Sequence, residues 1–141
     1  RSITAACIAL RLAVRRLIDS GECLPKELRP TREDIANGWT APELTAEEKH
    51  AHEMSVMAND VSAISVGLID GEVFLDLDYV LDSNADVDMN VVGTSDGMFV
   101  EVQGTGEEAT YSRKQFDSLM DMAELGLKRL QEIQSEALRE A

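Results

Sequence analysis

Five aspartates gather within thirteen residues of this sequence, at Asp76, Asp78, Asp82, Asp86 and Asp88. Two converging carboxylates suit a hard cation such as Mg²⁺, which takes oxygen ligands and keeps several of its waters. The alternative is a set of aspartates at hairpin ends, where such side chains hydrogen-bond the local backbone. An EF-hand loop is excluded, because Leu81 and Val87 stand where glycine and glutamate are needed.

The distribution of charge along the chain bears on the role of these aspartates. The chain has 141 residues and a formal net charge of −14, and no lysine or arginine occurs between Lys49 and Arg113. The aspartates therefore have no cation near them in the sequence. They must be solvated, paired with a distant basic segment, or bound to a metal ion.

Four runs of alternating or β-branched residues predict strands around the aspartates. Val61–Ile69 and Val73–Leu77 form one predicted hairpin across Asp70-Gly71, and Val87–Thr94 and Met98–Gly104 form a second. Residues two apart in a strand face the same way, so Asp86, Asp88 and Asn90 share a face. If the two hairpins are neighbours, the connection between them can bring Asp82 close to Asp88.

Two amphipathic helices flank these strands. A first apolar stripe recurs at spacings of three and four through Ile3, Cys7, Leu10, Val14 and Leu17. A second stripe begins after a capping box at Ser112 and Gln115 and runs from Phe116 to Leu138. Helices grouped against an antiparallel sheet predict an α+β fold, with a four-stranded, mainly antiparallel sheet packed against two amphipathic helices.

The segment from about 22–60 breaks this pattern and holds all three prolines, both histidines and the only tryptophan. We interpret it as an insertion or functional loop, with a possible helix start at Thr45 and Glu48. His50 and His52 lie two positions apart, which favours surface histidines over metal ligands. Trp39 is a candidate anchor for a partner or a locally packed side chain.

Other residue types favour ordinary roles. Arg11, Arg15 and Arg16 lie opposite the first stripe, on a solvated face or a binding patch. Cys7 suits a small buried hydrophobe, and we interpret the methionines as core filler. Two cysteines, no signal-peptide layout and no membrane-length apolar run predict a cytoplasmic protein without membrane contact. Because the chain begins with Arg1, inside a predicted helix, we expect it to be a fragment.

The aspartate-rich stretch also carries a resemblance. The run "SVGLIDGEVFLDLDYVLDSNADVDMNVV", followed by "FVEVQGTGEEATYSRKQFDSLMDMAELGL", resembles the second half of bacterial ribonuclease PH. The run "SITAACIAL" is similar to the start of a helix in that family. The matching positions are Ser65, Val66, Gly67, Asp70, Gly71, Asp76, Leu77, Tyr79, Asp82, Ser83, Ala85, Asp88 to Val92 and Glu101 to Thr105. The resemblance covers residues 1 to about 20 and about 61 to 138.

This resemblance implies a ribonuclease PH-type fold, related to domain 2 of ribosomal protein S5. It also implies a phosphate-dependent 3′-exoribonuclease that trims tRNA precursors, with rRNA as a second substrate. Inorganic phosphate attacks the terminal phosphodiester and a nucleoside diphosphate leaves. The family's two functional carboxylates fall on Asp82 and Asp88, which implies Mg²⁺ coordination and, for one of them, proton delivery to the leaving 3′-oxygen. Asp76, Asp78 and Asp86 receive no catalytic role and are interpreted as local structure.

The resemblance further implies a homo-oligomeric ring of six subunits that binds RNA 3′ ends. Three departures stand out. Leu81 replaces an acid, and the connection after the first helix is much longer than is usual in the family. The family's phosphate-binding Gly-Thr-Arg, which precedes Ser2-Ile3-Thr4, is not in the chain. We therefore predict that residues 1–141 form the C-terminal part of such a domain, with an inserted loop at about 22–60, and are inactive alone. The alternatives are a non-catalytic scaffold subunit of a ring and an interaction module acting through 22–60.

Overall fold

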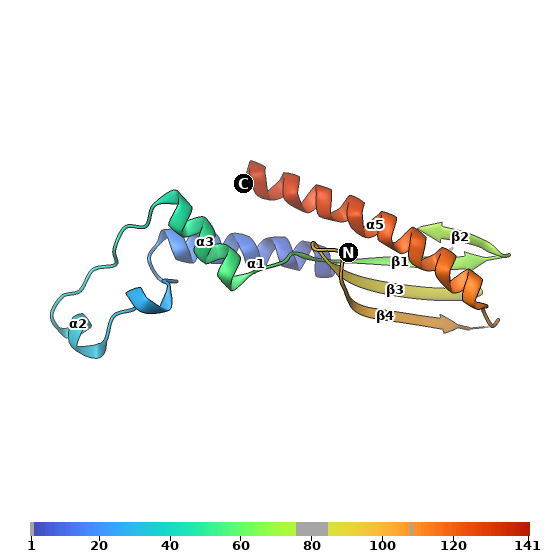
Figure 1. Cartoon of the computed structure of the whole chain (residues 1–141), viewed down its shortest axis with the longest axis horizontal. Helices are drawn as coiled ribbons and strands as arrows, with labels where there is room; N and C mark the ends of the chain where they lie inside the picture. The colour runs from blue at the N-terminus through green and yellow to red at the C-terminus, as the bar shows by residue number, and fades with distance from the viewer. Residues whose placement is uncertain (1, 76–84, 108) are drawn as a thin grey trace. The chain divides into compact units, whose positions relative to one another are not determined.

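A computed structural model describes residues 2–75, 85–107 and 109–141 of the chain (Figure 1). The chain divides into two compact units. We call Arg1–Cys7 with Asp60–Ala141 the sheet unit, and Ile8–Asn59 the helical unit. Helix α1 (Ser2–Asp19) contributes its first residues to the sheet unit and the rest to the helical unit.

The sheet unit contains four strands in the order β2-β1-β3-β4, and every neighbouring pair is antiparallel. The strands are β1 (Val61–Ile69), β2 (Glu72–Leu75), β3 (Val87–Thr94) and β4 (Phe99–Gly106). The α+β prediction is confirmed. The predicted bounds hold for β1 and β3, whereas β4 starts one residue later than predicted and ends two residues later.

The β1–β2 hairpin turns at Asp70-Gly71, as predicted. Both residues have positive φ, 51° and 81°, which matches the right-handed twist of the strands that they join. Asp86 supports this turn, because its carboxylate accepts a 3.0 Å hydrogen bond from the Asp70 N–H. Its own N–H donates to the Leu68 carbonyl over 2.8 Å. These contacts agree with the local structural role predicted for Asp86.

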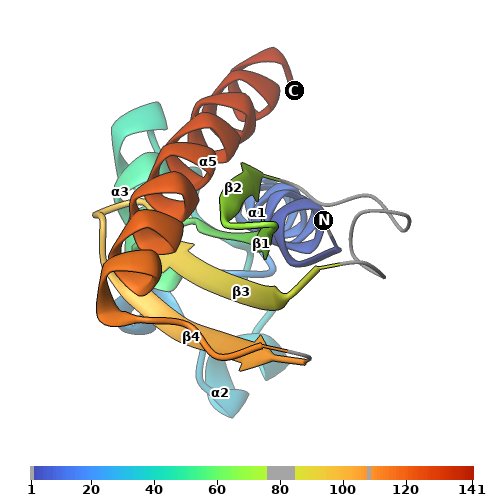
Figure 2. The same ribbon diagram turned by 90° about the vertical axis from the view of Figure 1, so that its right-hand side faces the viewer.

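Helix α5 (Arg113–Glu140) lies across one face of the sheet (Figure 2). It starts at the predicted capping box of Ser112 and Gln115. At Gly126 the helix approaches the strands so closely that a Cβ atom would lie 2.7 Å from Leu75 Cδ1. The core between the two layers consists of Val66, Leu68, Val87, Met89, Val91, Leu119, Ala123 and Leu127.

Near the C-terminal end of α5, the contacts between this helix, α1 and β1 are polar. The sequence pattern did not indicate this. Gln134, only 1% exposed, donates from Nε2 to the carbonyls of Thr4 and Val61 over 3.1 and 2.9 Å. The Thr4 hydroxyl accepts a hydrogen bond from the Ala63 N–H. Cys7 is buried, as predicted, and its sulfur accepts from the Val61 N–H. The first turn of α1 is thus joined to β1 and α5 by hydrogen bonds.

The helical unit consists of the rest of α1, η1 (Lys26–Leu28), α2 (Arg32–Ala36) and α3 (Ala46–Val56). The predicted capping box of Thr45 and Glu48 starts α3. Trp39 packs against the unit's apolar cluster, and a role for it as a partner anchor stays a prediction. The buried members of that cluster are Val14, Ile18, Leu24 and Leu44. Among the described residues, no helix combines the length and apolar character needed to cross a membrane.

The predicted apolar stripe of the first helix is wrong in its position. Its Ile3, Leu10 and Leu17 are exposed, whereas Cys7 and Val14 are buried. The buried line of α1 is Thr4, Cys7, Arg11, Val14 and Ile18. Both lines have the same spacing of three and four residues, so periodicity alone could not choose between them. Two polar side chains with hydrogen-bond partners occupy the buried line.

Arg11 differs most from its predicted environment. It was predicted on a solvated face or a binding patch, but it is only 3% exposed and its guanidinium contacts Glu53 Oε1 at 3.0 Å. It also donates to the Met57 carbonyl over 2.7 Å. Arg15 binds the same Glu53 carboxylate, while Arg16 is exposed, as predicted. Burial of Arg11 is tolerated because a carboxylate and a carbonyl replace its water.

Two further predictions need correction. Met54 and Met98 are exposed rather than core filler. Met54 lies on α3 with its sulfur beside the Arg11 guanidinium, and Met98 lies in the β3–β4 turn. His52 was predicted at the surface but is only 9% exposed. His50 is exposed, as predicted. A histidine's hydropathy gives no sign of its burial, because its ring packs as readily as it is solvated.

We expect the helical unit to lose stability in acid through Glu53. Burial raises the pKa of Glu53, but hydrogen bonds and charges from Arg15 and Arg11 lower it more, so its pKa lies below the ordinary value. A depressed folded-state pKa gives stability that is present above the unfolded value, about 4.3, and is lost as pH falls through the folded value. Trp39, the only tryptophan, reports unfolding of this unit by fluorescence.

The expected result is an unfolding midpoint that drops as pH falls from about 5 to about 3. Glu53→Gln is expected to flatten that drop, while Glu47→Gln, an exposed change on the same helix, keeps it. An equally steep acid loss in Glu53→Gln would assign the effect to other carboxylates.

Candidate active site

Asp88 lies at the centre of the sheet, on the face opposite α5. Strand β3 has neighbours on both sides, and Asp88 is paired with Gly67 of β1 and with Thr105 of β4. Its side chain is half-buried, and its Oδ1 atom is shielded from solvent. The second predicted site residue, Asp82, lies outside the described residues, as do Asp76 and Asp78.

The register places three short motifs of the family-like runs side by side: Ser65–Gly67 in β1, Asp88–Asn90 in β3 and Gln103–Thr105 in β4. One row across the sheet contains Ser65, Asn90 and Gln103, and the next contains Gly67, Asp88 and Thr105. Cross-strand partners in an antiparallel sheet project from the same face, so these residues form one polar surface. Within the first row, the Ser65 hydroxyl donates to Asn90 Oδ1 over 2.7 Å. We call the two rows the polar face.

The intervening residues of the same motifs build the core. Val66, Met89 and Val91 alternate with the polar face and are fully buried beneath α5. Gly104 lies between Met89 and Tyr111, where a Cβ atom would come within 2.9 Å of each side chain. Each motif therefore supplies packing from one face and polar groups from the other.

The polar face offers oxygen donors of the kinds that a hard cation prefers. Asp88 supplies a carboxylate, Thr105 of the same row supplies a hydroxyl, and Asn90 of the adjoining row supplies an amide oxygen. In the part of the chain that the structure describes, no three His, Cys, Asp or Glu side chains cluster at metal-binding distance. The predicted pairing of Asp88 with Asp82 therefore stays a prediction.

The sequence interpretation singled out Asp88 but gave no role to Ser65, Gln103 or Thr105. The alternation of side chains along each strand already separated these three residues from their neighbours, which project from the other face of the sheet. That separation becomes useful only once the register between strands is known. The alternation along one strand does not state which residue of its neighbour lies opposite.

Residues 60–125 match the family described as the 3′ exoribonuclease family, domain 2, a stretch that includes all four strands and the first half of α5. Residues 60–125 belong to the 3′ exoribonuclease family. The predicted resemblance to the C-terminal half of ribonuclease PH is confirmed by this match and by the relatives that follow.

Relatives within the 3′ exoribonuclease family are similar to the chain over different lengths. The ribonuclease PH of Corynebacterium kroppenstedtii is 60% identical over 78 residues, which are 55% of this chain and 31% of that protein. The ribonuclease PH of a Synechococcus species is 38% identical over 143 residues, covering 99% of this chain and 58% of that protein. The latter alignment extends through the segment at about 22–60. The chain spans about half the length of such relatives.

A solved structure supports the fold of this exoribonuclease-family domain. Rice (Oryza sativa) Rrp46 superposes with a TM-score of 0.51 at 18% sequence identity. The match covers 57% of this chain and 38% of the rice chain. At this identity the likeness concerns the fold alone, and it agrees with the four antiparallel strands and their covering helix.

Proposed function

We propose that this chain supplies the metal-binding carboxylates of a phosphorolytic 3′-exoribonuclease that trims RNA 3′ ends, with tRNA precursors as substrate. The observation that carries the proposal is the alignment of three family-like motifs in two rows around Asp88. Residues that are far apart in the sequence, Ser65, Asp88 and Thr105, share one surface there.

The donor chemistry of the polar face fits a magnesium ion held by Asp88 together with Asp82. When bound, Mg²⁺ would neutralise charge that develops on the transferred phosphoryl group. Asp88 is fixed in position because β3 is hydrogen-bonded on both edges. The hydrogen bond between Ser65 and Asn90 orients the amide beside it. One of the two aspartates delivers a proton to the leaving 3′-oxygen.

The charge of the chain indicates what a partner must supply. The net charge is −14, and RNA binding requires positive side chains that neutralise phosphates. The segment 50–112 contains no lysine or arginine. We propose that the phosphate site and most RNA contacts come from the other half of a ribonuclease PH-type subunit and from neighbours in a homo-oligomeric ring.

Joining the chain to the N-terminal half of a ribonuclease PH tests this proposal directly. The 141-residue chain alone is expected to release no nucleoside diphosphate from a tRNA precursor supplied with Mg²⁺ and inorganic phosphate. Fused behind the N-terminal half of the Synechococcus ribonuclease PH, the chain is expected to release diphosphates only when both Mg²⁺ and phosphate are present. The natural Synechococcus enzyme serves as the positive control.

Three outcomes would contradict the proposal. Diphosphate release by the chain alone would show that the phosphate site lies within it. Monophosphate release without phosphate would replace phosphorolysis by hydrolysis. A folded fusion that binds RNA without cleaving it would favour the non-catalytic scaffold subunit.

A further inference from the structure

The helical unit contains a cysteine and a serine that contact the same histidine through its two ring nitrogens. Cys23 Sγ lies 3.6 Å from His52 Nε2, and the Ser55 hydroxyl lies 3.2 Å from His52 Nδ1. Cys23 comes from the segment after α1, whereas His52 and Ser55 lie on α3. Cys23 is half-buried and His52 is 9% exposed. None of the three belongs to the proposed exoribonuclease site.

The hydrogen bonds of Ser55 assign the protons on the imidazole. The Ser55 hydroxyl lies 2.7 Å from the His52 carbonyl, which can only accept a hydrogen bond, so Ser55 donates there. The oxygen of Ser55 is then the acceptor for His52 Nδ1–H. This arrangement leaves the lone pair of Nε2 on the side of the Cys23 thiol. A second group that orients a base beside a nucleophile is the pattern of activated thiols.

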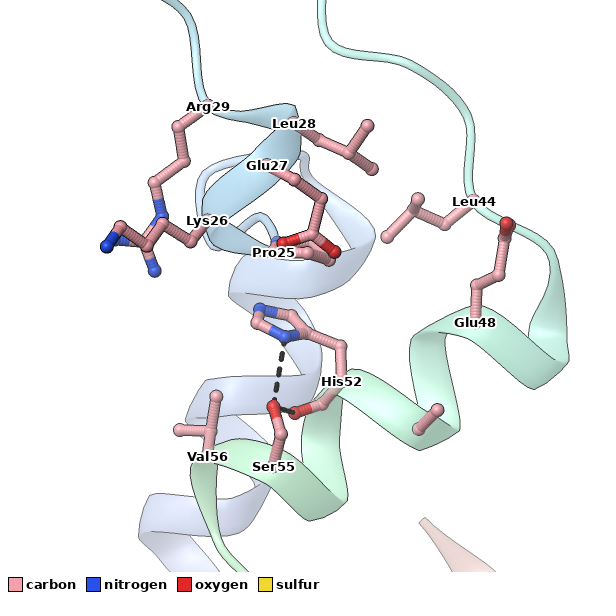
Figure 3. A pocket seen from close by; sticks show the side chains of 11 residues that line it. Pro25, Lys26, Glu27, Leu28, Arg29, Leu44, Glu48, His52, Ser55 and Val56 are labelled. Atoms are coloured by element: carbon pink, nitrogen blue, oxygen red, sulfur yellow. Dashed lines mark hydrogen bonds between the residues drawn. The ribbon is translucent and has the colours of Figure 1, made fainter.

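A cavity of about 650 Å³ adjoins this group (Figure 3). His52 and Ser55 line it directly. Leu28, Leu44 and Val56 give it an apolar wall, and Lys26 and Arg29 extend from η1 and its end. A small, partly apolar reagent can therefore approach the imidazole from the cavity.

We propose that Cys23 is a reactive thiol, activated by His52, that forms mixed disulfides with low-molecular-weight disulfides. The thiol proton passes to His52 Nε2, and the thiolate attacks one sulfur of the reagent. A new S–S bond forms as the reagent's own S–S bond breaks. The leaving group departs as a thiolate, and the proton on His52 passes to it or, when it is a weakly basic aromatic thiolate, to water, so no further oxidant or reductant is needed.

Cys7 is a natural control, because its sulfur contacts the Val61 N–H and the Asp60 carboxylate instead of an imidazole. The experiment compares Cys7→Ser, which keeps only Cys23, with Cys23→Ser, which keeps only Cys7. Both variants of the 141-residue chain react with an aromatic disulfide whose released thiolate is coloured. Rates are measured at neutral pH in the native state and in denaturant.

We expect the Cys7→Ser chain to react faster in the native state than in denaturant, by about tenfold. Adding His52→Gln, which keeps a polar side chain but accepts no proton, is expected to remove that acceleration. Ser55→Ala should reduce it partly, because the imidazole loses its orienting partner. Unchanged circular dichroism verifies that these variants are folded.

Equal native rates for Cys23 with and without His52→Gln would overturn the proposal. If His52→Gln does not fold, the comparison of native with denatured Cys7→Ser decides alone. A native rate at or below the denatured rate then shows that the contact is only a packed S–H···N hydrogen bond. The infrared S–H band of Cys7→Ser gives an independent readout, since a transferred proton weakens that band.

Discussion

In the fusion with the N-terminal half of the Synechococcus ribonuclease PH, Asp88→Asn is expected to reduce the rate of phosphorolysis at least about 10²-fold. The reason is that asparagine removes the charge that would hold the metal ion. Asparagine keeps the size of the side chain and the register of β3, so the loss should occur without unfolding. The measurement is the initial rate of diphosphate release from a tRNA precursor across a Mg²⁺ titration. Asp82→Asn is expected to have a similar effect.

Asp121→Asn is the matched control, since it makes the same change of charge at an exposed position on α5. Its rate should equal that of the unmodified fusion. If Asp88→Asn retained full activity with an unchanged Mg²⁺ dependence, the polar face would not be the catalytic surface. A loss equal to that of Asp121→Asn would indicate a general effect of charge on RNA binding.

The second large effect concerns the core between α5 and the sheet. Leu119→Ala is expected to lower the free energy of unfolding by about 2–5 kcal/mol, because it removes a fully buried side chain and leaves a cavity. Leu125→Ala makes the same substitution on the same helix, where the leucine is 63% exposed. That control is expected to change stability by no more than about 0.5 kcal/mol.

Urea unfolding followed by circular dichroism measures both variants, because α5 contributes much of the helical signal of the sheet unit. Similar losses in the two variants would mean that α5 does not use the described face to cover the sheet. A small loss at Leu119 alone would mean that neighbouring side chains collapse into the space it leaves.

Much of the fold was predictable because the strands are short runs of β-branched residues bounded by turn residues. The bounds of β1 and β3 followed from β-branched residues, and the Asp70-Gly71 pair marked the hairpin turn between β1 and β2. The two capping boxes were visible from residue types three positions apart. These features depend on local chemistry, which a sequence states directly.

Buried polar side chains were not predictable in the same way. Arg11, Gln134 and His52 are buried because of partners 42, 130 and 3 positions away, respectively. Burial of such groups depends on a hydrogen bond that must be formed in the folded chain, and hydropathy gives the opposite expectation. The first helix was misplaced for this reason.

The candidate site was predictable to the extent that it depends on a single strand. Asp88 and Asn90 share a face by alternation, and this was expected. Gln103 and Thr105 joined them only through the β3–β4 register. The approach of Asp82 to Asp88 depends on residues outside those described, so the metal pair rests on family resemblance.

The alternation of the motifs also restricts how the chain can change in length. Inserting or deleting one residue just before β3 would turn Asp88 toward Leu119 and Leu127, and would present Met89 to solvent. Such a shift would bury a charge and empty the hydrophobic layer at once. We therefore expect natural insertions and deletions just before β3 to contain an even number of residues, which keeps each side chain on its face of the sheet. Other changes in length should fall in loops that leave the pairing of β3 with β1 unchanged.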